Sequence, residues 1–377
     1  MPTTKIQNKI WLSSPHMGGT ELDYVQKAFD TNWIAPLGPN VNGFEKSIEN
    51  YIGTDAHVAC LSSGTAAIHL GLKLMGVAPG DEVLCQSFTF SGSANPIAYV
   101  GAKPVFVDSE RKTWNLSPEL LEEAILQRIR AGVKPKAIIA VHLYGMPYQA
   151  QAIREISERF EIPVLEDSAE ALGSSIGGQK CGTFGDIGIF SFNGNKIITT
   201  SGGGALVAKD KAQKEKAVFL STQARDAAPH YQHSHIGFNY RMSNVLAGIG
   251  IGQMEVLSDR VAARRKNFEF YKEALAHIDA IEFLAEPQDY YSNRWLTTIL
   301  TPDFKTREAI RFALESENIE SRPLWKPMHM QPVFKGCTTM ADGTSEELFN
   351  RGLCLPSGSN LTENDLECTV ELIKSLF

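Results

Sequence analysis

Short apolar runs alternate with longer amphipathic stretches along the first 210 residues. Runs of this length, bounded by turn residues, are typical of buried strands. They are HVACL (57–61), EVLC (82–85), PVFVD (104–108), AIIAVHLYG (137–145), IPVLED (162–167), IGIFSF (187–192) and GALVA (204–208). Helical periodicity lies between them, near residues 64–75, 92–100, 117–131 and 148–160. Alternating strands and helices predict an α/β fold whose mostly parallel sheet is covered on both faces.

The pattern changes beyond residue 240. A periodic segment from about Ser243 to His277 predicts helix, and it is followed by a strand-like run at 294–300, a helix near 305–317 and a final amphipathic helix from about Glu363. This mixture is typical of an α+β arrangement. At 377 residues the chain is long enough for two hydrophobic cores. We therefore predict a large domain over residues 1–250 and a smaller α+β domain over residues 251–377.

Composition narrows the class of function. The formal net charge is -7 and no run is rich in Lys or Arg, so nucleic acid is not an expected partner. No apolar run approaches the ~20 residues of a membrane-spanning helix, and the first residues lack the apolar segment of a signal peptide. The six cysteines and nine histidines show no metal-ligand spacing. We expect a cytoplasmic protein without a metal site or a membrane partner.

The candidate chemistry lies where the predicted strands end, because ligands of parallel α/β sheets bind at that edge. Glu166 and Asp167 end one strand, and strand alternation sends them to opposite faces, so one of them can face a ligand. Such a carboxylate suits Mg²⁺, a ribose, a protonated heterocycle nitrogen or a helix N-cap. The SSGT turn at 62–65 suits a bound anion or a simple cap. Phe90 suits a planar ligand or the core.

Together with Lys196, these features can be explained by a single ligand. Lys196 lies between the apolar run at 187–192 and a triple glycine at 202–204. A phosphate-holding turn, an aromatic ring, a strand-end carboxylate and a reactive lysine are the parts needed to bind pyridoxal 5′-phosphate (PLP) as a Schiff base. Taken alone, Lys196 would be more typical of a surface loop, because most lysines lie on solvated faces. The triple glycine predicts backbone that passes close to the cofactor or takes positive φ.

The order of the motifs resembles the DegT/DnrJ/EryC1/StrS family of PLP-dependent sugar aminotransferases. The motifs are SSGTAA, SFTF, PVFVD, HLYG, EDSAEALGS, GDIGIFSFNGNK, TSGGGALV and GFNYRMSN, and the similarity runs from about residue 9 to the C-terminus. The resemblance implies an aspartate aminotransferase-like (type I) PLP fold with a mostly parallel seven-stranded sheet. PHMGG (15–19), WIAPLG (33–38), STQAR (221–225), RPLWKPMHMQPVFKG (322–336) and CLPSG (354–358) are similar to the branch that aminates UDP-4-keto-6-deoxy-N-acetylglucosamine on the bacillosamine route.

Carried over by position, the resemblance assigns roles to individual residues. Lys196 becomes the Schiff-base lysine, Asp167 the partner of the pyridine nitrogen, and Phe90 the ring that stacks on the cofactor. The implied phosphate ligands are Ser63, Gly64, Thr65 and Ser191. Asn239 would reach the phosphate in the neighbouring subunit, which implies a homodimer with shared active sites. Glu170 stands where many relatives carry Gln or His, and its contact with the PLP hydroxyl, the sugar amine or both stays open.

The implied reaction has two halves. L-Glutamate converts PLP to pyridoxamine phosphate and leaves as 2-oxoglutarate, and the nucleotide keto sugar then takes the amine at C4. A UDP sugar carries two phosphates, so basic side chains are expected near it. The candidates are Arg225, Arg241, Arg322 and His329, whereas Lys326 is more typical of a plain surface residue.

Other classes of function fit the sequence less well. A related group that removes a sugar hydroxyl carries His in place of the lysine. A PLP-binding regulator would need a DNA-binding domain, and a nicotinamide dehydrogenase would need a G-x-G-x-x-G turn that is absent. A catalytically silent scaffold would tolerate loss of Lys196 or Asp167, yet both are present. Within the family, dTDP- or GDP-linked sugars and amination at C3 remain alternatives.

Overall fold

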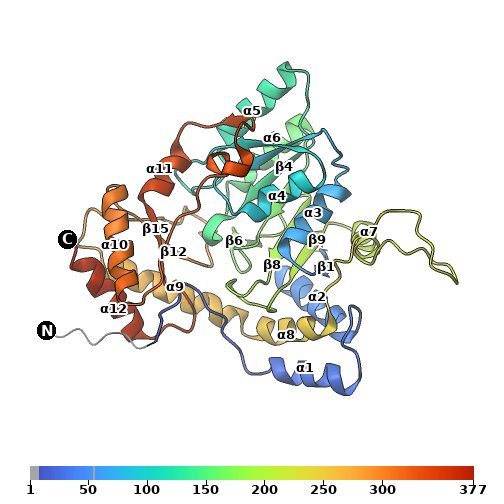
Figure 1. The fold of residues 1–377 in the computed structure, drawn as a ribbon, viewed down its shortest axis with the longest axis horizontal. Helices are drawn as coiled ribbons and strands as arrows, with labels where there is room; N and C mark the ends of the chain where they lie inside the picture. The colour runs from blue at the N-terminus through green and yellow to red at the C-terminus, as the bar shows by residue number, and fades with distance from the viewer. Residues whose placement is uncertain (1–7, 54–55) are drawn as a thin grey trace.

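The computed structural model describes residues 8–53 and 56–377, so residues 1–7, which bear on the expected lack of a signal peptide, lie outside the described part. Its centre is an eight-stranded sheet of order β1-β9-β8-β5-β4-β2-β3-β14 (Figure 1). Every neighbouring pair from β8 to β14 is parallel. β9 is antiparallel to both of its neighbours. The predicted α/β class and mostly parallel sheet are therefore confirmed.

All seven predicted strands belong to this sheet. They are β1 (His57–Leu61), β2 (Glu82–Gln86), β3 (Lys103–Val107), β4 (Ala137–Val141), β5 (Val164–Asp167), β8 (Ile187–Ser191) and β9 (Gly204–Ala208). The eighth strand, β14 (Thr339–Met340), comes from the C-terminal part of the chain and pairs with β3 at the edge. Two residues carry too little periodicity to predict a strand, which explains why the sequence pattern misses it.

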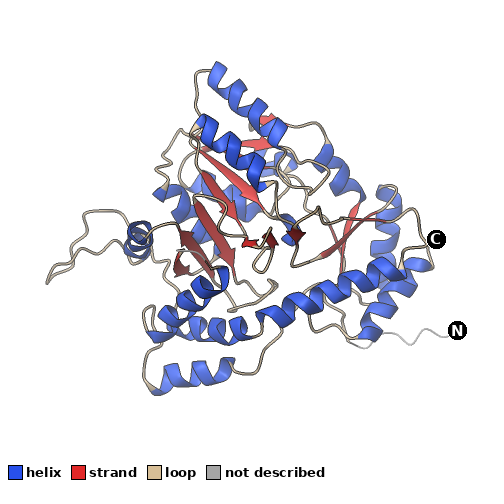
Figure 2. Ribbon diagram, turned by 180° about the vertical axis from the view of Figure 1, so that it is seen from behind, coloured by secondary structure: helices blue, strands red, loops and turns tan. Residues whose placement is uncertain are grey.

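Helices cover both faces of the sheet. Alternate strand side chains pack on one face against α3 (Gly64–Leu74), α4 (Ser91–Tyr99) and α7 (Lys211–Ser221). The other face is covered by α2 (Pro39–Ile52), α5 (Pro118–Arg130), α6 (Ala150–Phe160) and α8 (Asn244–Glu255). α1 (Glu21–Asp30) packs against α8 on the outside of the molecule (Figure 2). The four helices predicted before residue 161 correspond to α3 to α6, whereas α1, α2 and α7 were not predicted.

Several helices begin where the sequence carries a capping residue. The Ser63 hydroxyl accepts a hydrogen bond from Ala66 N–H at the start of α3, over 3.0 Å. Ser117 caps α5 in the same way, and Pro118 follows at the first helical position, where its missing N–H costs nothing. Caps of this kind fix the strand-to-helix turns, and these turns form the edge of the sheet where ligands bind.

The C-terminal part of the chain builds a second, four-stranded sheet. Its strands, in the order β10-β12-β15-β13, are β10 (Glu282–Phe283), β12 (Thr297–Leu300), β15 (Gly352–Leu355) and β13 (Arg322–Pro323). The surrounding helices are α9 (Leu257–Ala274), α10 (Phe304–Ser316), α11 (Thr344–Arg351) and α12 (Glu363–Lys374). The predicted helix over 243–277 is thus two helices, because α8 ends just before Val256 and α9 begins just after it.

Three segments connect the two parts across the predicted boundary at residue 250. Ile10 forms a parallel bridge to Ile319 and packs in the C-terminal core. β11 (Tyr290–Tyr291) pairs with β6 (Ser175–Ile176), which in turn pairs with β7 (Gln179–Lys180). β14 is the third segment. Within the described residues, no helix has both the length and the apolar character needed to cross a membrane.

Candidate active site

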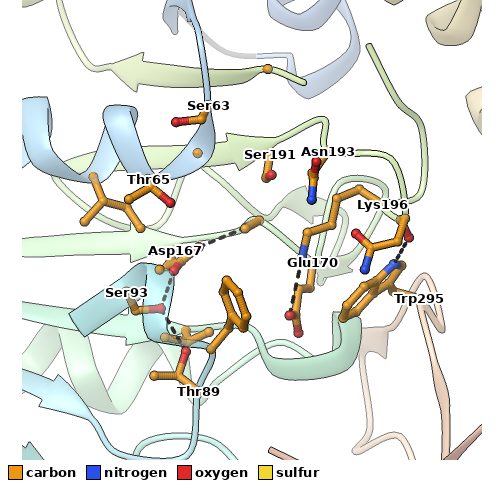
Figure 3. A pocket seen from close by; sticks show the side chains of 18 of the residues that line it. Ser63, Thr65, Thr89, Ser93, Asp167, Glu170, Ser191, Asn193, Lys196 and Trp295 are labelled. Carbon is orange, nitrogen blue, oxygen red and sulfur yellow. Dashed lines mark hydrogen bonds and ion pairs between the residues drawn. The ribbon is translucent and has the colours of Figure 1, made fainter. Parts of the chain in front are cut away.

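A pocket of about 290 Å³ opens at the carboxyl ends of the central strands (Figure 3). β5 and β8 contribute their last residues, the turn after β1 contributes the start of α3, and the turn after β2 contributes the start of α4. The predicted residues that line this pocket are Ser63, Gly64, Thr65, Phe90, Asp167, Glu170, Ser191 and Lys196. The structure thus brings together residues up to 133 positions apart, from Ser63 to Lys196.

Asp167 points into the pocket because it shares a strand face with Leu165, which packs toward α3 and α4. The hydroxyl of Ser93 donates to its Oδ2 over 2.6 Å, and Ala169 N–H donates to its Oδ1 over 3.1 Å. Ser93 Oγ lies 2.8 Å from Thr89 Oγ1, so the carboxylate ends a short chain of buried hydroxyl groups (Figure 3). The carboxylate is therefore fixed in orientation and aimed into the pocket.

Glu166 points to the opposite face and serves the fold. Backbone N–H groups of residues 182, 184 and 185 donate to it, and His142 Nε2 lies 2.7 Å from its Oε1. Burial opposes ionisation, but these hydrogen bonds outweigh it and hold the pKa of Glu166 below its ordinary value. Cys181 lies close by, and burial raises the pKa of its thiol. His142, Glu166 and Cys181 are within metal-binding reach of one another, yet hydrogen bonds within the protein already occupy His142 and Glu166.

The turn from β1 into α3 forms a concave site lined by small residues, which we call the α3 cup: Ser63, Gly64, Thr65 and Ser191. The first N–H groups of a helix have no intrahelical acceptor, and the positive helix end adds to their attraction for an anion. The hydroxyl groups of Ser63, Thr65 and Ser191 surround this helix end. A Cβ at Gly64 would lie 2.9 Å from Ser191 Cβ, so a larger residue would close the cup. This donor set suits a phosphate dianion.

The triple glycine after Lys196 has a steric explanation at its last member. A Cβ at Gly204 would lie 2.4 Å from Gly64 N, because β9 passes directly beside the turn into α3. All three glycines have negative or extended φ, while Ser201 just before them has φ 70°. The predicted positive φ is therefore wrong. The close approach at Gly204 is to the turn into α3, while Gly202 and Gly203 line the pocket, and the approach to the cofactor itself stays a prediction.

Lys196 lies between a carboxylate and an aromatic ring. Its Nζ is 3.4 Å from Glu170 Oε1 and 4.1 Å from the centroid of the Trp295 ring (Figure 3). Glu170 Oε2 accepts the N–H of Tyr144 over 2.7 Å. Burial raises the pKa of Glu170, although Lys196 and this N–H act in the opposite direction. The pair places a proton donor and a proton acceptor side by side in the pocket.

The turn Asn193–Lys196 is held through its backbone. The carbonyl of Asn195 accepts hydrogen bonds from Trp295 Nε1–H and from the hydroxyl of Ser13, each over 2.7 Å. Lys196 N–H donates to the carbonyl of Asn193 over 3.0 Å. The side chains of Asn193 and Asn195 line the pocket. The turn therefore aims Lys196 and also presents two amides to an occupant.

None of the predicted substrate-binding basic residues lines the pocket of this chain. Arg241 is buried, donates to Glu45 and the Cys60 carbonyl, and so is a structural residue, which corrects its prediction as a substrate contact. The other residues have local partners outside the pocket as well. Arg322 pairs with Glu320, His329 lies 2.6 Å from Ser87 Oγ and 3.2 Å from Glu346 Oε1, and Arg225 is exposed with its guanidinium over the Tyr231 ring. Among the described lining residues, Lys196 alone is cationic.

The lining residues without a role in the sequence interpretation include Thr89, Ser93, Trp295 and Trp325. Ser93 follows Phe90 by three positions at the start of a predicted helix, and this spacing places both on one side of the first turn. That signal could have identified Ser93. Trp295 precedes a short strand in the C-terminal part, and only the tertiary fold brings it to Lys196.

The residues present fit PLP by their chemistry. The cup at α3 matches its phosphate, Asp167 can pair with a protonated ring nitrogen, Phe90 offers an aromatic face and Lys196 offers the amine. Asn239 is exposed and lies outside this pocket, next to Thr222, with which it forms an antiparallel bridge. A role for Asn239 in a neighbouring subunit remains a prediction.

Comparison with known proteins agrees with this assignment. EpsN of Bacillus subtilis (strain 168), named as a pyridoxal phosphate-dependent aminotransferase, is 52% identical over 99% of this chain and 97% of its own. GDP-perosamine synthase of Caulobacter vibrioides is 37% identical over 95% of this chain and 96% of its own. The crystal structure of a DegT DnrJ EryC1 StrS aminotransferase from Brucella abortus matches with a TM-score of 0.89 and 30% identity, covering 94% of this chain and 95% of that one. The family model matches residues 15–374, and the chain therefore belongs to the DegT/DnrJ/EryC1/StrS aminotransferase family, whose members are PLP-dependent sugar aminotransferases.

Proposed function

We propose that this aminotransferase moves the amino group of L-glutamate to C4 of a UDP-linked 4-keto-6-deoxy-N-acetylhexosamine. The product would be a UDP-4-amino-4,6-dideoxy sugar for a surface glycan or glycoprotein. The observation that carries the transamination is the convergence of Lys196, Asp167 and the α3 cup on one pocket. Bound PLP supplies an electron sink that stabilises the carbanion formed when a proton leaves the substrate.

The chain's own residues divide the remaining work. Lys196, beside Glu170, is placed to move a proton between the amine-bearing carbon of the substrate and the aldehyde carbon that the cofactor would present. Asp167 keeps a positive ring nitrogen in place through charge and a fixed hydrogen-bonding geometry. The hydroxyl groups and N–H groups of the cup hold the phosphate, so that the ring is anchored at both ends.

The sugar assignment has narrower support. The motifs shared with the bacillosamine branch favour a UDP-linked 4-keto sugar. The amides of Asn193 and Asn195 face the pocket and suit an acetamido group, because an amide both donates and accepts hydrogen bonds. The similarity to a GDP-perosamine synthase makes a GDP-linked keto sugar the main alternative.

We also propose that the enzyme works as a homodimer. The segment 223–238 after α7 forms an arm that extends away from the body of the molecule (Figures 1 and 2). Tyr231 and Ile236 on this arm are 80% and 89% exposed, which is unusual for large apolar side chains without a partner. A second copy would cover them and could bring Asn239 and Arg225 to the pocket, which has a single cation of its own among the described residues.

A substrate panel tests the proposal. The PLP-loaded protein is mixed with L-glutamate and with UDP-, dTDP- or GDP-linked 3-keto or 4-keto sugars, and the products are identified by mass spectrometry and NMR. We expect glutamate to bleach the PLP absorbance and the UDP-4-keto sugar to be aminated at C4. Amination of a GDP- or dTDP-linked sugar alone would refute the UDP assignment, and a protein whose absorbance does not respond to glutamate would refute the transamination.

A further inference from the structure

Tyr144 has a backbone conformation that needs an explanation. It lies in the short helix η1 (Leu143–Gly145) with φ 56° and ψ 18°, the left-handed region that bulky residues rarely adopt. Its side chain is buried, with 3% exposed. A conformation of this kind costs free energy and persists only where its surroundings hold it, and such residues concentrate at functional sites.

The surroundings of Tyr144 hold this turn from behind. The carbonyl of Gly145 accepts a hydrogen bond from the hydroxyl of Ser174 over 2.7 Å. A Cβ at Gly145 would lie 1.9 Å from Asn293 Oδ1, so the space behind the turn is filled. The amide of Asn293 also donates to the carbonyl of Glu170 over 2.9 Å. The turn and the backbone of Glu170 are therefore fixed to the same side chain.

The two ends of Tyr144 contact two different parts of the site. Its backbone N–H donates to Glu170 Oε2 over 2.7 Å, and its hydroxyl accepts the backbone N–H of Trp325 over 2.8 Å. Its ring also stacks on Trp325, with centroids 6.1 Å apart and an angle of 20° between the planes. Trp325 in turn lies 5.5 Å from Phe90, and both line the pocket. The rings of Phe90, Trp325 and Tyr144 thus form a row that begins at the pocket wall, and the last of them, Tyr144, donates its backbone N–H to Glu170.

We propose that Tyr144 is a positioning residue that couples Trp325 on the pocket wall to Glu170, so that a nucleotide sugar resting on Trp325 changes the position of Glu170 relative to Lys196. This inference rests on the proposed function, because it takes the occupant of the pocket to be the nucleotide sugar. Glu170 is also faced by Asp167 and by the buried thiol of Cys354. A small displacement of Glu170 therefore changes the distance between its carboxylate and Nζ of Lys196, and with it the electrostatic interaction between the two groups.

The test is a pH titration of the absorbance of the PLP-loaded protein, with and without saturating UDP-N-acetylglucosamine, which has no keto group to be aminated. In the wild type we expect the ligand to shift the midpoint by about 0.7 pH unit, equal to about a fivefold coupling between the two sites. Tyr144→Phe removes the hydroxyl that holds Trp325 and keeps both the ring and the N–H to Glu170. This variant should bind the ligand and lose most of the shift.

Tyr290→Phe is the matched control. It removes the same atom from a tyrosine of the same hydrophobic cluster, where the hydroxyl contacts the carbonyl of Tyr148 at 3.5 Å, and it should keep the full shift. Should Tyr144→Phe fail to fold, Trp325→Ala is the second variant: it keeps the backbone N–H that bonds the Tyr144 hydroxyl but removes the ring that stacks on Tyr144 and lines the pocket. It should lose the shift at saturating ligand.

The outcomes separate this inference from the proposed function. Equal shifts in the wild type and in the Tyr144→Phe or Trp325→Ala variant, or a wild type that binds the ligand without any shift, would overturn the coupling alone. A wild type that does not bind UDP-N-acetylglucosamine would overturn the UDP assignment and with it this inference. A wild type whose absorbance does not respond to glutamate would refute the transamination itself.

Discussion

Two adjacent carboxylates at the end of β5 have different surroundings, so loss of charge should affect them differently. Asp167 faces the pocket and, within the described part of the chain, accepts two hydrogen bonds, from Ser93 and Ala169. Asp167→Asn keeps the shape and removes the charge that would hold a protonated ring nitrogen. We expect kcat to fall by about 10²–10⁴-fold, with a free energy of unfolding close to that of the wild type. Steady-state kinetics and urea unfolding of the same preparation check both parts, and a variant of full activity would contradict the role of Asp167.

Glu166→Gln should have the opposite effect. Its buried carboxylate accepts hydrogen bonds from backbone N–H groups and from His142. In the variant, the NH₂ group of Gln would replace one accepting oxygen, so that donors would face donors. We expect a loss of roughly 3 kcal/mol of stability at neutral pH. Hydrogen bonding depresses the pKa of Glu166 below 4.5, so its contribution is present above that pH and is lost as the pH falls through the depressed pKa. Urea unfolding over a range of pH should show the difference between variant and wild type shrinking in acid, and a difference that stays constant would contradict this account.

At the scale of elements, the start of α4 contributes two supports to the proposed cofactor ring. Phe90 precedes the helix and Ser93 lies within its first turn, where it donates to Asp167. Ser93→Ala should leave the buried Asp167 with one hydrogen bond fewer and weaken PLP binding about tenfold, because a bond to a charged group contributes about 1.4 kcal/mol or more.

Titration of the apoprotein with PLP, followed by fluorescence, measures this effect. Ser93→Thr keeps the hydroxyl and should restore most of the affinity. Thr89→Val removes only the outer hydroxyl of the chain and should have a smaller effect. Equal affinities for Ser93→Ala and the wild type would show that the hydrogen bond in Figure 3 does not support the cofactor.

The elements that the sequence predicts are those whose signal is local. Parallel strands such as β4 are buried on both faces and therefore appear as continuous apolar runs, and two of the helices between them, α3 and α5, begin at serine caps. β14 and the two-residue strands of the small sheets depend on long-range pairing, so their sequences carry no period. α1 and α2 lie outside the strand–helix alternation, and for this reason the pattern gave no prediction for them.

The same limit applies to the site. The residues that hold the cofactor come from motifs at strand ends, whose common edge follows from parallel topology. Arg241 lies outside these motifs, in the segment before α8. Its burial beside Glu45 depends on how this segment packs against β1 and α2, which no local pattern reveals. Trp295 reaches Lys196 only because the C-terminal part folds back over the sheet edge. Chemistry at strand ends could be predicted, whereas contacts between the two parts of the molecule could not.

At the scale of the whole molecule, Asn239 lies outside the pocket of its own chain, so its proposed role can be tested only in a dimer. If Asn239 completes the pocket of a partner, Lys196→Ala and Asn239→Ala destroy different sites of a mixed dimer. One site then carries both changes, and the other carries neither. Random pairing makes half of the dimers mixed, each with one intact site, so co-expression of the two inactive variants should restore about a quarter of wild-type activity.

Two differently tagged chains allow the mixed dimer to be purified by sequential affinity steps and assayed with glutamate and the keto sugar. The matched control combines Lys196→Ala with Asp167→Asn, two residues of the same chain's pocket, and this mixture should stay inactive because every site carries one of the changes. Recovery in the first mixture and none in the second would show that Asn239 acts across the dimer, where the arm at 223–238 extends from the body of each chain. No recovery in either mixture would place Asn239 outside the shared site and leave the exposed arm without this role.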